Sequence, residues 1–257
     1  MSQALNRPEH RHIEESAGAA LGRHLAVLDS LEARVVAIGD AGLGPAAFST
    51  SLGLEDQAIL HAIARTASDI DVFVLDTGRH FPETLETLDR SEQHYGLRVR
   101  VIAPDATDLE KLVARDGAFG FRLSVEARKA CCDIRKVRPL RLALEGAAVW
   151  ITGLRREQSA GRGTVPFAAW DGDYRMIKVN PLADWSLERL EAYVAANGIP
   201  VNPLHARGFP SIGCQPCTRA ILPGEDVRAG RWWWEQEDGK ECGLHNNPRR
   251  PRAEAVA

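Results

Sequence analysis

The chain has 257 residues, with 32 Lys and Arg against 35 Asp and Glu and a formal net charge of −3. Its composition, 44% hydrophobic and 26% charged, is typical of a soluble globular protein that buries a sizeable core. No run of eighteen apolar residues occurs, which excludes a membrane-spanning helix, and the near-neutral charge gives no sign of a nucleic-acid footprint. Residues 1–16 lack the apolar stretch of a secretory signal, so we expect a cytoplasmic protein.

The N-terminal part combines a polar start with a helical pattern. Residues 1–12 are polar, and apolar residues then recur at helical spacing over residues 13–38, which predicts one long amphipathic helix. Residues 39–45 are rich in glycine and form a turn. We treat residues 1–40 as the first of three segments of the chain.

Short apolar stretches alternate with helical patterns from residue 46 to about residue 200. Strands are expected at residues 46–51, 71–75, 97–102 and 149–152, and helices at residues 55–67, 82–94, 108–115 and 187–196. This alternation predicts an α/β fold with a mostly parallel sheet flanked by helices. Ligands of such sheets bind beyond the carboxyl ends of the strands, so the loops after Phe48, Leu75 and Ile151 are where we expect a site. Residues 41–200 are therefore the expected nucleotide-binding domain.

Polar side chains are concentrated in these three loops. The first loop reads STSLGLED, the second LDTGRHFPET and the third GLRREQSAGR. Hydroxyls and a glycine before a helix suit a phosphate, although the same residues also suit a helix cap without a ligand. Neither a Walker A nor a dinucleotide-binding spacing is present. The 27 arginines among the 32 basic residues are explained equally well by compositional bias or by anion binding. The three loops together favour a nucleotide or phosphate ligand.

Four of the five cysteines fall in two pairs. Cys214 and Cys217 form a CxxC motif in a loop, and Cys131 and Cys132 lie on a predicted helix. A disulfide framework is not expected in a reducing compartment, whereas four thiolates suit a structural zinc ion or an iron–sulfur cluster. Side chains of adjacent helical residues diverge by roughly 100°, which suits a cluster better than a single ion. A redox pair of the thioredoxin kind and inert buried thiols are the alternatives.

The fifth cysteine, Cys242, lies in the last segment, residues 201–257, where the apolar periodicity is lost. Lys240 and His245 would stabilise its thiolate, while Glu241 would oppose this. A partly exposed thiol near cations is a typical nucleophile. An idle surface cysteine is the alternative.

From about residue 46 to residue 246 the sequence resembles the phosphoadenylyl-sulfate reductase family, and within it the bacterial assimilatory enzymes that act on adenylyl sulfate. The resemblance rests on the three loops above and on the segments KACCDIRK, SIGCQPCTR and KECGLH. The two cysteine pairs are its most specific feature, because relatives that use the 3′-phosphorylated substrate commonly lack them and keep the cysteine of ECGLH.

The resemblance implies an adenine-nucleotide α-hydrolase-like fold of the PP-loop type, with a C-terminal segment tethered by an iron–sulfur centre. It implies a [4Fe–4S] cluster on Cys131, Cys132, Cys214 and Cys217, and Cys242 as the catalytic nucleophile, assisted by Lys136 and His245. The substrate-binding residues that it implies are Ser49, Ser51, Gly53, Glu55, Asp56, Leu75, Asp76, Thr77, Gly78, Arg79, Arg155, Arg156, Gln158, Arg162, Arg228 and Arg231. Residues of the first two loops would hold the adenosine, and Lys136, His245 and the later arginines would face the phosphosulfate.

The implied reaction is the thiol-dependent reduction of adenosine 5′-phosphosulfate to sulfite and AMP, as in sulfate assimilation and cysteine biosynthesis. It would pass through an S-sulfocysteine on Cys242 that reduced thioredoxin or glutaredoxin resolves. The nearest alternative is the same reaction on 3′-phosphoadenosine 5′-phosphosulfate. A PP-loop ATP pyrophosphatase of tRNA thiolation and a zinc- or cluster-bearing binding module are less favoured. No nucleic-acid or membrane partner is expected, and a homo-oligomer is left open.

Overall fold

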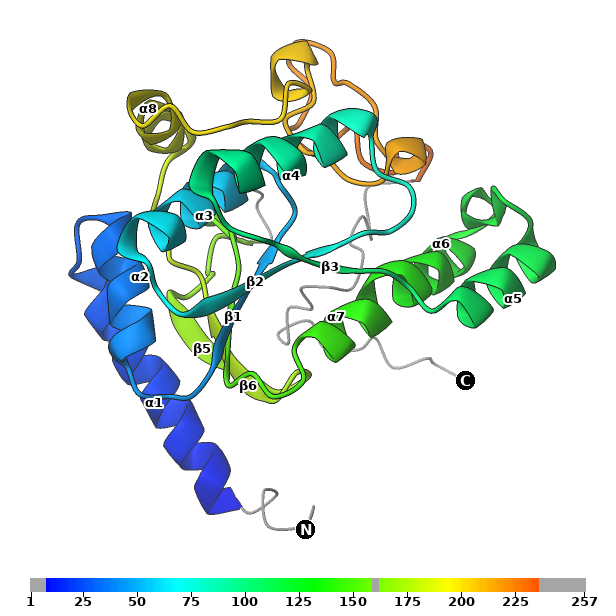
Figure 1. Cartoon of the computed structure of the whole chain (residues 1–257). Helices are drawn as coiled ribbons and strands as arrows, with labels where there is room; N and C mark the ends of the chain where they lie inside the picture. Colours follow the sequence, from blue (N-terminus) through cyan, green and yellow to red (C-terminus); the bar gives the residue numbers. More distant parts are fainter. Residues whose placement is uncertain (1–7, 159–161, 236–257) are drawn as a thin grey trace.

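The computed structural model describes residues 8–158 and 162–235, which form an α/β fold around one sheet (Figure 1). The described strands are β1 (Ala46–Thr50), β2 (Ile70–Leu75), β3 (Arg100–Ile102), β4 (Val149–Ile151), β5 (Ala168–Asp171) and β6 (Met176–Val179). Their order in the sheet is β3-β2-β1-β4-β6-β5. Neighbouring strands run parallel except for β5 and β6, so the expected mostly parallel sheet is confirmed.

Helices cover both faces of this sheet (Figure 1). The described α-helices are α1 (Pro8–Ala26), α2 (Leu31–Asp40), α3 (Leu54–Thr66), α4 (Pro82–Tyr95), α5 (Ala106–Asp116), α6 (Val125–Cys132), α7 (Arg138–Ala143) and α8 (Leu187–Ala196). Helices α2, α3 and α8 pack on one face, and α7 packs on the other. Helix α8 has the bounds expected from the sequence, because Ser186 caps it through a hydrogen bond from the Arg189 N–H.

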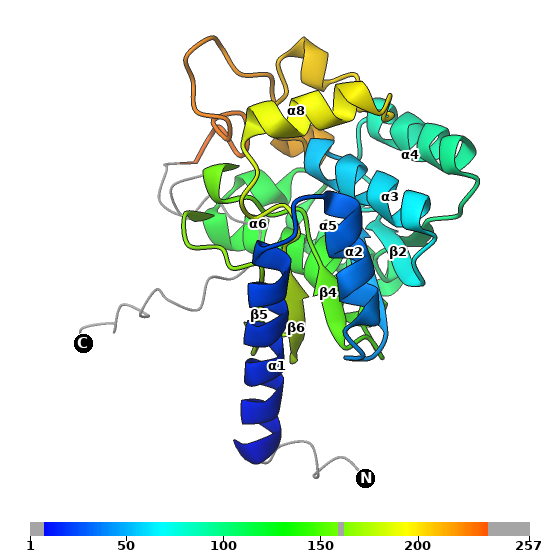
Figure 2. The same ribbon diagram turned by 90° about the vertical axis from the view of Figure 1, so that its left-hand side faces the viewer.

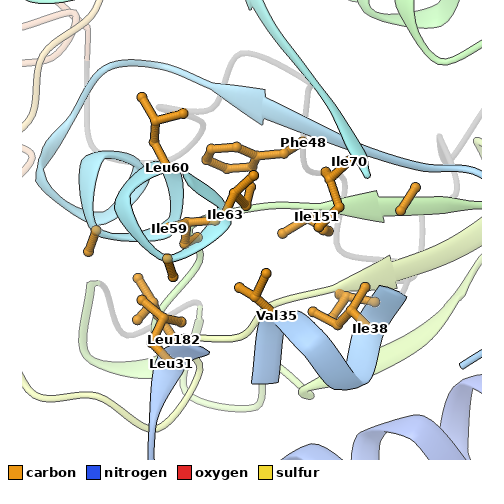
Figure 3. Packing of buried hydrophobic residues seen from close by; sticks show 14 of the residues in the cluster. Leu31, Val35, Ile38, Phe48, Ile59, Leu60, Ile63, Ile70, Ile151 and Leu182 are labelled. Atoms are coloured by element: carbon orange, nitrogen blue, oxygen red, sulfur yellow. The ribbon is translucent and has the colours of Figure 1, made fainter. Parts of the chain in front are cut away.

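Alternate residues of the same strands fill the two sides of the core. Phe48 and Ile151 belong to the cluster that they share with Val35 of α2 and with Ile59 and Ile63 of α3 (Figure 3). Phe73 and Trp150 belong to the cluster that packs beneath α7. Successive side chains of a strand point to opposite faces of the sheet. Because both faces are buried here, the sequences of the central strands are continuously apolar.

The single long helix expected over residues 13–38 is wrong, because two helices cover this part of the chain. Ser30 adopts an extended backbone between them, and its hydroxyl accepts a hydrogen bond from the Ala33 N–H at 3.1 Å, which starts α2. Helix α1 packs against β5 (Figure 2). Gly22 makes the close approach possible, since a Cβ there would lie 3.1 Å from the Ala168 carbonyl oxygen.

The hairpin of β5 and β6 was not expected from the sequence. Each of its strands is only four residues long. The turn between them is held by Asp171, whose Oδ1 accepts hydrogen bonds from the backbone N–H groups of Asp173 and Tyr174. An Asp-Gly-Asp sequence between two short apolar stretches was the available signal.

Beyond residue 200 the helices of the described chain are short 3₁₀ turns, η6 (His205–Arg207) and η7 (Gln215–Cys217), and an isolated antiparallel bridge joins Thr218 to Arg231. The Gln215 N–H donates to the carbonyl oxygen of Arg79, and Arg122 donates to the carbonyl oxygen of Pro216. These bonds hold the segment at the end of the sheet where β2 ends. No helix within the described ranges is both long and apolar enough to cross a membrane.

Candidate active site

A cleft of about 600 Å³ lies where β1, β2 and β4 end. Loops that follow these three strands form much of its wall, and residues 210–213 and 227–232 complete it. A volume of this size is typical of small-molecule sites. The cleft therefore lies at the edge of the sheet where the sequence analysis predicted a ligand site.

The structure brings most of the expected site residues to this cleft. Those in its wall are Ser49, Ser51, Gly53, Glu55, Asp56, Leu75, Thr77, Lys136, Arg155, Gln158, Arg162, Arg228 and Arg231. Asp76, Gly78, Arg79 and Arg156 are not among the residues that line it. Cys242 and His245 lie outside the described residues.

The four residues away from the cleft wall have other contacts. Asp76 Oδ1 accepts a hydrogen bond from the Gly78 N–H at 2.8 Å, so these two residues form the turn after β2, with Gly78 in the left-handed region. Arg79 stacks on Phe121 and lines a neighbouring cavity. Arg156 donates to a backbone carbonyl oxygen and lies over the ring of Phe167. These four residues thus lie beside the cleft and not in its wall, and their expected substrate contacts stay a prediction.

A carboxylate of the chain itself occupies the turn between β1 and α3. The backbone N–H and the hydroxyl of Ser51 both donate to Asp56 Oδ2, each at 2.6 Å. The other carboxylate oxygen lies against the loop after β4, where a Cβ on Gly153 would be 2.2 Å from it. Asp56 thus takes two donors of Ser51, which lies just before the N-terminus of α3. Burial raises the pKa of Asp56 from 3.8 to about 6, although the hydrogen bonds from Ser51 act in the opposite direction.

The arginines of the loop after β4 are also held by the protein. Arg155 is buried, and its Nε donates to Glu55 Oε1 at 2.9 Å. Arg162 donates to the side chain of Gln158. This end of the cleft therefore combines carboxylates with cations that already have carboxylate or amide partners.

Cys131, Cys132, Cys214 and Cys217 line one small cavity beside the cleft. Cys131 and Cys132 end α6, Cys217 ends η7 and Cys214 immediately precedes η7, and none of the four is in a disulfide. Lys136, Arg231 and Trp232 line both the cleft and this cavity, so the two spaces share a wall. The predicted helix that carries Cys131 and Cys132 is confirmed as α6.

A π-helical turn, η3 (Asp133–Val137), follows α6 directly. Such turns occur often at functional sites because they re-aim the side chains that follow. Here Arg135 Nη1 donates to the Thr77 carbonyl oxygen at 2.5 Å, and Lys136 reaches the shared wall. The turn thus links the cysteine helix to the loop after β2.

Cations surround the four thiols. The cavity wall includes Arg79, Arg128, Arg135, Lys136 and Arg231. Burial by itself would raise the pKa of Cys214, but Lys136, a hydrogen bond with Thr77 and nearby arginines outweigh it, and this pKa is lowered. Burial raises the pKa of Cys217 to about 12, and the neighbouring Cys214 adds to this rise.

A single metal ion and a metal cluster need differently spaced donors. Within the described part of the chain, no three His, Cys, Asp or Glu side chains are grouped so that they could hold one metal ion. Four thiols line a single cavity together with several cations, and a group of several metal atoms can take thiol donors that are spread apart in this way. The residues present therefore fit an iron–sulfur cluster.

Sequence reasoning missed several residues of the cleft wall. His80 and His205 line the cleft, and each bonds a backbone carbonyl oxygen through one ring nitrogen. Burial lowers the pKa of both imidazoles. Trp150 also reaches the wall from the core, where its indole N–H donates to the Ser49 hydroxyl at 2.8 Å. His80 lies within the LDTGRHFPET motif, but no pattern marked Trp150 or His205.

Known proteins resemble this chain in sequence and in fold. A family model described as the phosphoadenosine phosphosulfate reductase domain matches residues 45–220. A protein of Agrobacterium fabrum named adenosine 5′-phosphosulfate reductase is 54% identical over 227 residues, which are 88% of this chain and 86% of that protein. A protein of Rhizobium meliloti with the same name is 57% identical over 206 residues, 80% of this chain and 78% of its own.

Among solved structures, the crystal structure of phosphoadenylyl-sulfate reductase from Candida auris, a phosphate complex, matches with a TM-score of 0.68 at 23% identity. The match covers 84% of this chain and 98% of that one. It confirms the fold that was expected from the sequence.

The buried carboxylate of Asp56 leads to a first prediction. Because its pKa in the folded protein lies above 3.8, its contribution to stability is fully present at low pH and is lost as the pH rises through about 6. Asp56→Asn removes this titration, and its amide oxygen still accepts from Ser51. The free energy of unfolding of Asp56→Asn, taken relative to that of wild type, should therefore be higher at pH 8 than at pH 5 by about 1–2 kcal/mol. Urea unfolding at both pH values measures this, and a stability difference independent of pH would contradict it.

Proposed function

The chain belongs to the phosphoadenosine phosphosulfate reductase family, and from this premise we propose how its cleft reduces adenosine 5′-phosphosulfate (APS). Relatives that cover most of the chain carry the name of the APS enzyme, so APS reduction is its activity and the 3′-phosphorylated substrate is not favoured. It is therefore an oxidoreductase of sulfate assimilation.

One observation carries the proposed orientation of the substrate, namely how the charges of the cleft wall are paired. Lys136 and Arg231 stand at the wall shared with the cysteine cavity, whereas Asp56 and Glu55 stand at the turn between β1 and α3. The arginines at that turn already have partners, because Arg155 is paired with Glu55 and Arg162 donates to Gln158. The phosphosulfate would be stabilised by the cations and repelled by the carboxylates. We therefore place the phosphosulfate beside Lys136, Arg228 and Arg231. The ribose hydroxyls and the adenine amino group then face the acceptors near Asp56.

The proposed reaction begins with the thiolate of Cys242. It attacks the sulfate sulfur in line with the leaving oxygen, forming an S–S bond while the bond from sulfur to the phosphate oxygen breaks. The electron pair stays on that oxygen, and AMP leaves. Lys136, His245 and the arginines at this end of the cleft would stabilise the negative charge that builds up there. The enzyme is left with an S-sulfocysteine at Cys242.

A dithiol protein, reduced thioredoxin or glutaredoxin, completes the proposed cycle. One of its thiolates attacks the sulfur of Cys242, which releases sulfite and leaves a mixed disulfide. Its second thiol resolves this disulfide and returns Cys242 to the thiol, so the dithiol supplies both electrons. The need for reduced dithiol and free thiols fits a reducing compartment, and we place the protein in the cytoplasm.

Cys131, Cys132, Cys214 and Cys217 are proposed to hold a [4Fe–4S] cluster. When bound, the cluster would supply a buried charged group beside the phosphosulfate end of the cleft. Lys136 lies in the wall between the two spaces, so its ammonium group would be oriented between the cluster and the substrate. The four cysteines that line one cavity support this proposal.

Cys242→Ser should abolish sulfite release, because a serine hydroxyl cannot form the sulfonated intermediate or be resolved by a thiol. Binding of AMP and the visible absorbance of the cluster should be unchanged, since neither the cleft wall nor the four cysteines are altered. Sulfite assays with APS and reduced thioredoxin, together with AMP titration, measure this. Turnover retained by the variant would remove Cys242 from the mechanism.

Cys214→Ala should lose iron and lower the melting temperature, since metal binding to a folded site supplies folding free energy. Iron and zinc analysis and absorbance spectra after anaerobic purification are the measurements. Cys242→Ser, which alters a cysteine outside the set, is the control and should keep its iron. Zinc in place of iron, or an unchanged iron content and melting curve, would contradict the cluster assignment.

Lys136→Gln should lower kcat/KM for APS by about 100-fold, the usual effect of removing one donor to a developing negative charge. Its melting temperature should change little. Lys111→Gln, at an exposed position of α5, is the matched control and should keep full activity. Equal rates for the two variants would exclude the proposed role of Lys136.

A further inference from the structure

A buried ion pair fixes the end of the described chain. Arg128 of α6 is fully buried, and its Nε donates to Glu235 Oε1 at 2.5 Å. The Glu235 side chain is only 6% exposed. A buried charge is strongly destabilising without its partner, so each of these side chains holds the other in place. The backbone at residue 235 is thereby fixed to α6.

Trp232 strengthens this attachment. Its indole lies under two guanidinium groups, with Arg128 Cζ 4.5 Å and Arg231 Cζ 4.8 Å from the ring centre. Its φ of 43° lies in the left-handed region, which a bulky residue rarely adopts. Such a backbone persists only where the surroundings hold it. Here Trp232 is buried with Cys214 and Cys217, and its N–H donates to the Cys217 carbonyl oxygen at 3.1 Å.

The ion pair connects the cysteine helix with the chain that leads to Cys242. Arg128 precedes Cys131 and Cys132 by three and four residues on α6, which is the spacing of one helix face. Glu235 precedes Cys242 by seven residues in the sequence. Seven residues span at most about 25 Å, so a fixed residue 235 limits where the Cys242 thiol can go.

We propose that the Arg128–Glu235 ion pair is a positioning device, which anchors the chain at residue 235 beside the cysteine cavity and so keeps Cys242 within reach of the phosphosulfate. This inference rests on the proposed role of Cys242. Neither residue of the pair touches substrate in this account. They act through the length of chain between residue 235 and Cys242. A shorter length of free chain raises the effective concentration of the Cys242 thiol at the sulfate sulfur of the substrate.

Glu235→Gln and Arg128→Met remove the ion pair from either side, and Glu235→Gln keeps the size and a hydrogen-bonding oxygen of the side chain. Arg219→Met is the matched control, because Arg219 forms a 2.8 Å ion pair with Glu225 in the same segment at a partly exposed position. The readout is the single-turnover rate at which Cys242 gains a sulfonate group from saturating APS, followed by intact mass. AMP affinity and iron content are measured on the same samples.

We expect Glu235→Gln to slow sulfonation about twofold, with AMP affinity and iron content close to wild type. Loss of the anchor lengthens the tether from the seven residues after Glu235 to the ten residues after Trp232, and effective concentration falls as about the −3/2 power of that length. Arg219→Met should sulfonate at the wild-type rate. The double variant Arg128→Met/Glu235→Gln should be no slower than Arg128→Met alone, because both changes remove the same anchor.

Wild-type sulfonation rates in Glu235→Gln would overturn the inference. So would a loss of iron in Glu235→Gln that accounts for the whole loss of rate, since the pair would then only support the cysteine site. Should wild-type protein bind AMP but never gain a sulfonate, the proposed function itself would fail. This failure of the proposed function is distinguishable from failure of the anchor, in which the wild type gains the sulfonate and Glu235→Gln gains it equally fast.

Discussion

Strand β1 pairs in parallel with β2 on one side and with β4 on the other, so three loops leave the sheet at the same edge. Residues far apart in the chain, such as Ser51, Thr77 and Arg155, line one cleft because of this pairing. The apolar residues of the same strands alternate between the two sides of the core, which leaves the strand ends for polar side chains. The location of the site is therefore a consequence of the sheet topology, whereas its chemistry depends on the loops.

Charge divides the cleft into two ends with different tasks. At the turn after β1, the carboxylate of Asp56 uses donors that would otherwise attract an anion, and its burial raises its pKa to about 6. A buried carboxylate with a raised pKa weakens the folded state at neutral pH, as is common where function rather than stability selects a residue. At the opposite end, Lys136 and Arg231 stand between the cleft and the four cysteines. A substrate with one neutral end and one anionic end suits this division.

Local sequence signals predicted the regular elements well and the exceptions poorly. Helix α8 was expected at its observed bounds because a serine cap and the apolar spacing act within a few residues. The break between α1 and α2 was missed, since helical periodicity continues across Ser30 and only its backbone geometry ends the pattern. In the site, motif resemblance pointed to many residues of the cleft wall. It also pointed to Asp76 and Arg156, which lie outside that wall and whose substrate contacts stay a prediction. His205 and the Arg128–Glu235 pair were not found, because they depend on contacts between segments far apart in the chain.

In the proposed reaction the sulfonate of APS passes to Cys242 before any reductant acts. The most direct test mixes anaerobically purified protein with APS in the absence of dithiol, and compares the AMP released with the sulfonate found on Cys242 by peptide mass analysis. The account predicts one AMP for each sulfonated Cys242 and no sulfite until thioredoxin is added. Sulfite formed without a modified Cys242, or AMP released without any adduct, would contradict it.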